Sequence, residues 1–163
     1  MNAILLLDAL KIECKKAVKG LKMSMMPQQG DKELTQREPA IHLMRLPESR
    51  SYERVAPYII VQFVTGKHNR VEPPKPYNKA TVRFICCVYD SNEEQGALNL
   101  LNVMTAIQMH LLKLVKIGKC FTLDPEVGIE MIAYTNDSAP FYGGELVADF
   151  FMPPIEQEVD LVG

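Results

Sequence analysis

Apolar and polar residues alternate along residues 79–90, a pattern typical of a β-strand with one buried face. One face carries Val82, Phe84, Cys86 and Val88, and the other carries Arg83, Ile85, Cys87 and Tyr89. Because successive side chains of a strand point to opposite faces, we expect the first set to lie in the core.

After this strand, apolar residues recur every three or four positions, which is typical of an amphipathic helix. The apolar positions are Ala97, Leu98, Leu101, Met104, Ile107, Leu111, Leu114 and Val115. They predict one wide apolar stripe that must be covered by a sheet. We expect Leu101 to meet Phe84 in the core between the helix and the sheet.

Both ends of this helix carry recognisable signals. Ser91 and Glu94 have the spacing of a capping box, which predicts that the helix begins at Asn92. Gly118 can adopt the left-handed conformation of a helix stop, so the helix is expected to end just before it.

The remaining pattern predicts a second helix and further strands. The helix is expected over residues 2–21, with its lysines facing solvent. Strands are expected at 57–65, 126–134 and 145–152, with optional short strands at 40–46 and 119–123. Residues 23–38 have no sustained period and are expected to be irregular. Residues 136–144, which end in Tyr142-Gly143-Gly144, supply turn residues.

A basic, proline-rich connection, Gly66 to Asn78, joins two of the predicted strands. Its prolines lack the N–H group that a strand ladder needs. Long loops in compact domains are usually functional or disordered. We therefore expect a large protruding loop that contacts a partner. Its candidate contact residues are Lys67, His68, Arg70, Pro73, Pro74 and Lys75.

Together these elements predict an α+β fold, with a mostly antiparallel sheet of about four to five strands and two helices packed on one face. Residues 1–155 are expected to form a single domain, followed by an acidic tail at 156–163. The second face of the sheet carries Arg83, Glu130 and Asp149 among apolar residues. This mixture predicts a partly solvent-exposed surface or a subunit contact.

The formal net charge of −2 shows no excess of either sign, so neither a membrane nor sequence-specific nucleic acid is an expected partner. The apolar run at residues 3–7 is too short for a signal-sequence core or a membrane span. A reducing cytoplasmic setting is therefore expected.

We find no catalytic or metal-binding motif in the sequence. The cysteines and histidines are scattered, at Cys14, Cys86, Cys87, Cys120, His42, His68 and His110. We expect free buried thiols, no metal, no cofactor and no enzymatic activity. His110 is interpreted as a structural histidine at the edge of the long helix. Glu93 and Glu94 are interpreted as charges that favour the helix start.

Several local phrases, together with the order of elements, resemble the tail terminator and tail-completion proteins of long-tailed bacteriophages and of related phage-tail-like particles. These phrases are Pro39-Ala40-Ile41 through Leu46-Pro47, Pro57-Tyr58-Ile59-Ile60-Val61-Gln62, Val88-Tyr89-Asp90 at the helix junction, and Gly143-Gly144-Glu145-Leu146. The resemblance covers about residues 1–155.

The resemblance implies a structural virion protein that forms a ring, hexameric in this family. Such a ring terminates the tail tube and joins it to the head side. The implied partners are further copies of the chain, the tail tube protein and a head–tail connector protein, and the implied location is a virion tail assembled in the bacterial cytoplasm. The alternative is a host-encoded small ligand-binding or enzymatic α+β domain.

Overall fold

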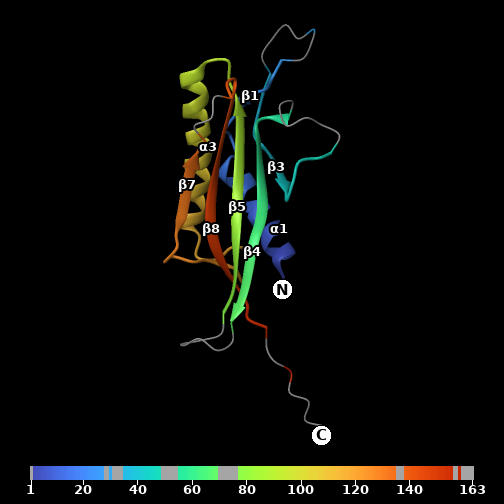
Figure 1. Ribbon diagram of the computed structural model, residues 1–163, viewed down its shortest axis with the longest axis vertical. Helices are drawn as coiled ribbons and strands as arrows, with labels where there is room; N and C mark the ends of the chain where they lie inside the picture. Colours follow the sequence, from blue (N-terminus) through green and yellow to red (C-terminus); the bar gives the residue numbers. More distant parts are fainter. Residues whose placement is uncertain are drawn as a thin grey trace.

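The computed structural model describes residues 2–27, 30, 35–48, 55–69, 77–134, 138–155 and 158. This part of the chain forms two layers, a six-stranded sheet and a pair of helices that both pack on the same face of it (Figure 1). The expected α+β class and the mostly antiparallel sheet are confirmed.

The sheet runs in the order β3, β4, β5, β8, and both β6 and β7 pair with β8. The strands are β3 (Ala40–Leu43), β4 (Tyr58–Asn69), β5 (Tyr77–Tyr89), β6 (Thr122–Leu123), β7 (Ile129–Ala133) and β8 (Phe141–Met152). Only the pairing of β3 with β4 is parallel among these described strands. A separate antiparallel pair, β1 (Met23–Ser24) and β2 (Gln36–Arg37), lies in the segment expected to be irregular.

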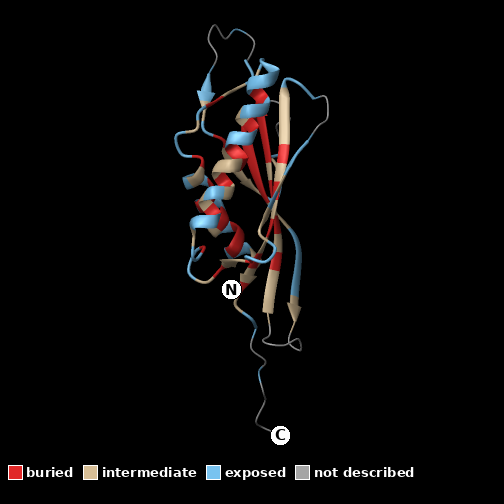
Figure 2. Cartoon of the chain, turned by 90° about the vertical axis from the view of Figure 1, so that its left-hand side faces the viewer, coloured by how far each residue is buried: buried red, intermediate tan, exposed pale blue. Residues whose placement is uncertain are grey.

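The core lies between the sheet and the helices, and the face expected to be buried is the one that faces them. Val82, Phe84, Cys86 and Val88 are all buried, which confirms the interpretation of the alternating pattern. The Phe84 and Phe150 rings meet edge to face with their centroids 6.3 Å apart. Figure 2 shows this buried band in red between the layers.

Helix α1 (Ala3–Ala17) begins with Asn2, whose Oδ1 accepts a hydrogen bond from the Leu5 N–H. It ends four residues earlier than the expected Leu21. Its side toward the sheet buries Leu6, Leu7, Leu10 and Cys14, and also Glu13.

Helix α3 (Glu93–Lys113) begins one residue later than expected, because Asn92 and not Ser91 is its N-cap. The Asn92 Oδ1 accepts a hydrogen bond from the Gln95 N–H at 3.0 Å. The helix ends at Lys113, since Leu114 is already extended. Gly118 has the expected positive φ of 60°, but it lies in the next turn, between Ile117 and Phe121.

The buried side of α3 also differs from the expected stripe. Leu98, Leu101 and Val115 are exposed, while the neighbouring Leu100 and Val103 are buried. The expected contact of Leu101 with Phe84 is therefore wrong. The helix carries apolar residues on two sides, and periodicity alone does not say which side meets the sheet.

The expected loop from Gly66 to Asn78 is strand at both of its ends. Strand β4 continues to Asn69 and β5 starts at Tyr77, with Gly66 opposite Ala80 and Asn69 opposite Tyr77. The described ladder runs as far as the pair of Asn69 with Tyr77. Residues 70–76 lie outside the described part of the chain.

Gly143 and Gly144 were expected in a turn, but both lie inside β8. A Cβ on Gly144 would come within 2.7 Å of the Met104 sulfur and 2.8 Å of the Ile132 carbonyl oxygen. These glycines therefore allow α3 and β7 to approach the strand closely and do not form the turn.

Candidate functional site

The face of the sheet turned away from the helices is the candidate site, and we call it the outer face. Neither α1 nor α3 covers it (Figures 1 and 2). At one end it carries a second apolar cluster of Val55, Ala56, Tyr58, Ile60, Cys87 and Tyr89. Beyond this cluster it carries a row of charged and polar side chains along β5 and β8.

Lys79 is held in the first part of this row. Its Nζ lies 3.3 Å from Asp124 Oδ2 and 3.4 Å from Asp149 Oδ2. It also lies 5.8 and 5.9 Å from the ring centroids of Tyr77 and Phe151. Burial lowers the pKa of Lys79, but the hydrogen bonds and charges of the two aspartates outweigh burial and raise it above the ordinary value. The lysine is thus a fixed cation that links β5, β8 and the turn after β6.

Arg83 forms the second part of the row. Its Nε donates to Gln62 Oε1 at 3.1 Å and lies 3.3 Å from Glu145 Oε2. The Glu145 Oε2 is buried and accepts no hydrogen bond from the described residues. Arg83 Nε is the cation that the described residues place beside this buried oxygen, so the ion pair compensates its charge.

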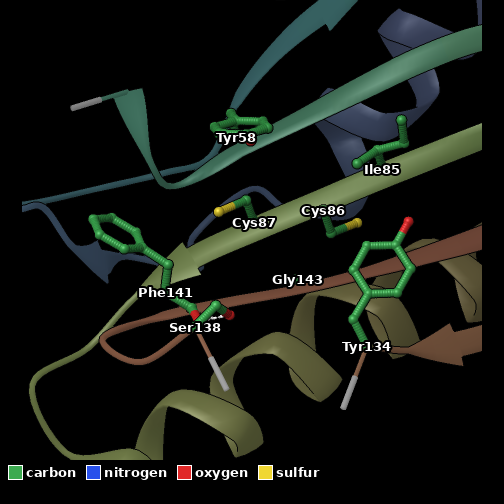
Figure 3. A pocket seen from close by; sticks show the side chains of 8 residues that line it. All are labelled: Tyr58, Ile85, Cys86, Cys87, Tyr134, Ser138, Phe141 and Gly143. Atoms are coloured by element: carbon green, nitrogen blue, oxygen red, sulfur yellow. Dashed lines mark hydrogen bonds between the residues drawn. The ribbon is translucent and has the colours of Figure 1, made fainter. Parts of the chain in front are cut away.

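A pocket of about 190 Å³ opens on the outer face beside the second apolar cluster, which supplies Tyr58 and Cys87 to its lining (Figure 3). Its lining consists of Tyr58, Ile85, Cys86, Cys87, Tyr134, Ser138, Phe141 and Gly143. Gly143 leaves room for the Tyr134 ring, because a Cβ there would come within 3.1 Å of it. The pocket is mostly apolar and matches the size of cavities that accept one small aromatic ring.

The surroundings of Cys87 and Tyr134 in the pocket favour the neutral form of each side chain. Burial raises the pKa of the Cys87 thiol, although a hydrogen bond with Tyr58 acts in the opposite direction. Burial also raises the pKa of Tyr134, aided by the Glu145 charge and opposed by Arg83. Burial thus favours the protonated thiol, which is the less nucleophilic form of cysteine.

The structure brings together only some of the predicted contact residues. Arg83 and Asp149 lie within the outer-face row, and Glu130 is exposed beside it on β7. Lys67 is exposed on β4, in register with Lys79. Arg70, Pro73, Pro74 and Lys75 lie outside the described residues.

His68 has a different place from the one expected. Its Nε2 accepts a hydrogen bond from the Ile155 N–H at 3.0 Å, and Asn78 Nδ2 donates to the Pro153 carbonyl at 3.3 Å. His68 therefore attaches the segment after β8 to the end of the β4–β5 hairpin, where it serves an internal contact.

Sequence reasoning missed Lys79, Glu145 and Asp124 as site residues. The alternation of β5 and β8 places Lys79 and Glu145 on the same face as Arg83 and Asp149, so this signal was present. Asp124 had no such signal, because it comes from the turn after β6. Its N–H reaches the Asp149 carbonyl oxygen at 2.9 Å.

The described residues also bear on metal binding, disulfide formation and membrane insertion. No three His, Cys, Asp or Glu side chains of this part of the chain are grouped so that they could hold a metal ion. The four cysteines are free. Neither described helix has the length and apolar character to cross a membrane. His110 is a paired structural residue, as expected, with its Nε2 2.6 Å from Glu13 Oε2.

The comparisons add no relative to this description. No protein-family model matches the chain, and no curated protein shows significant sequence similarity to it.

Proposed function

We propose that this protein is a ring-forming tail terminator, which closes the end of a phage-type tail tube and joins it to the head side. The observation that supports the proposal best is the outer face, which carries semi-buried ion pairs beside apolar side chains and is covered by neither α1 nor α3. Mixed surfaces of this kind are typical of subunit contacts. Closed rings form when unlike surfaces of identical subunits meet around a rotation axis.

The family phrases fall on elements that shape this face. Pro57 to Gln62 leads into and begins β4, and Gly143 to Leu146 lies in β8. Glu145, the ion-pair partner of Arg83, belongs to the second phrase. The face carries nearly balanced charge, since Lys67, Lys79 and Arg83 stand against Asp124, Glu130, Glu145 and Asp149. Balanced charge suits a protein partner better than a nucleic acid.

The test is a charge reversal on the outer face. Glu130→Lys changes an exposed side chain, so folding should be preserved. Ring formation, followed by sedimentation and electron microscopy with and without tail tube protein, should be lost. Asp8→Lys makes the same charge change on the exposed side of α1 and should leave rings intact. A wild-type protein that neither oligomerises nor associates with tube protein under any condition would refute the proposal.

The pocket favours a second candidate function, a small ligand-binding domain. Its aromatic walls at Tyr58 and Phe141 and its volume of about 190 Å³ suit one apolar ring. Saturable binding of benzene or indole, with chemical-shift changes confined to the pocket and no oligomer at any concentration, would favour this function over the ring.

A further inference from the structure

The exposed side of α3 carries a second apolar stripe, which we call the α3 stripe. It consists of Leu98, Leu101, Thr105, Met109 and Leu112. The four apolar side chains are 47–56% exposed, and Thr105 is half-buried. At 3.6 residues per turn, the five positions lie within a sector about 80° wide. The buried residues of α3, such as Val103 and Ile107, lie on the opposite side.

The α3 stripe is symmetric about Thr105. Leu98 and Leu112 each lie seven residues from it, and Leu101 and Met109 each lie four residues from it. An antiparallel copy of the same helix, centred on Thr105, would therefore place Leu98 beside Leu112 and Leu101 beside Met109 at both ends. Self-complementarity of this kind is the condition for a two-fold contact between identical subunits.

Charge follows the same symmetry. The first turn of α3 contains Glu93 and Glu94, and its last turn contains His110 and Lys113. In the antiparallel arrangement centred on Thr105, Glu94 of each helix lies opposite position 116 of the other, about 4.5 Å along the axis from Lys113. The opposed helix dipoles favour the same arrangement, whereas a parallel pair would bring like charges together.

We propose that two copies of this protein pair through antiparallel α3 helices, with the two-fold axis passing at Thr105. The paired stripe would extend about 21 Å from Leu98 to Leu112. The small Thr105 side chain permits close approach at the centre, and leucine and methionine fill the contact on both sides. The contact uses the helix layer, so it goes beyond the proposed ring and does not depend on the outer face.

The first test introduces a charge into the stripe of the full chain. Leu101→Asp should raise the dimer dissociation constant at least tenfold, measured by sedimentation velocity over a concentration series. Ile4→Asp changes a side chain that is 65% exposed in the first turn of α1, and it should leave the dissociation constant unchanged. Circular dichroism verifies that both variants fold. A wild-type chain that stays monomeric at the highest concentration, or a dimer insensitive to Leu101→Asp, would overturn the proposal.

The second test locates the axis by cross-linking. Thr105→Cys should form an intermolecular disulfide under mild oxidation, because helices packed 8–10 Å apart bring facing Cα atoms to about 4–6 Å at the axis. Lys113→Cys is the matched control, since its own copy would lie about 24 Å away along the seam. Equal cross-linking of the two variants would overturn the antiparallel register. Association that requires a different tail protein would assign the stripe to that protein and overturn the pairing.

The proposed ring contact on the outer face and the proposed dimer through the α3 stripe can be refuted independently of each other. Glu130→Lys should abolish rings and retain the α3 dimer, whereas Leu101→Asp should abolish the dimer through a different surface. If Glu130→Lys also abolishes the dimer, a single contact forms both the ring and the dimer. That outcome contradicts the two-fold proposal.

Discussion

Glu13 Oε2 lies 2.6 Å from His110 Nε2, joining the two helices across 97 residues of sequence. Lys16 Nζ lies 3.3 Å from the other carboxylate oxygen. Burial alone would raise the pKa of Glu13, but the hydrogen bonds from His110 and Lys16 and their charges outweigh burial and lower it. The pair therefore stabilises the helix layer in the ionised form of Glu13.

Removing this carboxylate should destabilise the protein in a pH-dependent way. Glu13→Gln should cost about 1.5–3 kcal/mol near neutral pH, the range for hydrogen bonds to charged groups. Because the folded pKa is lowered, the contribution of Glu13 is present above its ordinary value of 4.5 and is lost as pH falls through the folded pKa. Urea unfolding of both proteins from neutral to acid pH measures this. Glu93→Gln, at an exposed site, is the control and should cost less than about 1 kcal/mol at neutral pH.

The start of α3 gives a second prediction. Asn92→Ala should cost about 1 kcal/mol, because the Gln95 N–H loses its acceptor. Ser91→Ala should change the free energy of unfolding by less than about 0.5 kcal/mol, as expected for a surface site. A larger loss for Ser91→Ala than for Asn92→Ala would reverse the assignment of the cap.

The buried side of α3 is tested by two neighbouring leucines. Leu100 is 4% exposed, and Leu100→Ala should cost about 2–5 kcal/mol by loss of burial and creation of a cavity. Leu101 is 47% exposed, and in the monomer Leu101→Ala should cost about 0.5 kcal/mol or less. Chemical denaturation at low protein concentration compares them directly. Equal losses would mean that the helix is rotated from the orientation described.

The close approach of α3 to β8 gives a fourth prediction. A Cβ on Gly96 would lie 2.2 Å from Tyr142 Cε2, which requires the ring or the helix to move. Gly96→Ala should therefore destabilise by about 1–3 kcal/mol through overpacking, although alanine favours a helix by about 1 kcal/mol over glycine. The exposed neighbour gives the opposite control, since Ala97→Gly should cost about 1 kcal/mol by propensity alone. A stabilised Gly96→Ala protein would contradict the packing.

The strands were predictable because successive side chains of a strand point to opposite faces. When one face is apolar and the other is mixed, only the apolar face can be the buried one. Phe84 and Cys86 could only point to the core if Arg83 pointed away from it. The same alternation was sufficient to place Asp149 on the outer face with Arg83. In β5 and β8, therefore, the fold and part of the candidate site followed from the sequence.

Neither the buried side of α3 nor the role of the glycines in β8 was predictable, and the reason is physical. Leu100 and Leu101 are both apolar, and only the position of the sheet decides which one is buried. Gly144 reads locally as a turn residue, but Met104, 40 residues earlier, explains it through close packing. Asp124 joins Lys79 from a turn that the sequence does not connect to β5. Each case depends on contacts between residues distant in sequence, which local patterns do not contain.

The last prediction concerns Lys79, which compensates the charges of Asp124 and Asp149 on the outer face. Lys79→Met keeps the aliphatic contact but leaves two partly buried carboxylates, Asp124 only 5% exposed, without their cation. The free energy of unfolding should fall by about 1–3 kcal/mol, the cost of leaving buried polar groups unsatisfied.

The control is Lys67→Met, because Lys67 lies opposite Lys79 in the ladder and is exposed. This variant should lose less than about 0.5 kcal/mol. The loss in Lys79→Met arises from uncompensated negative charge on Asp124 and Asp149. Urea unfolding of the two variants at neutral pH measures it. If Lys79→Met and Lys67→Met lose equally little at neutral pH, the ion-pair row does not stabilise the outer face.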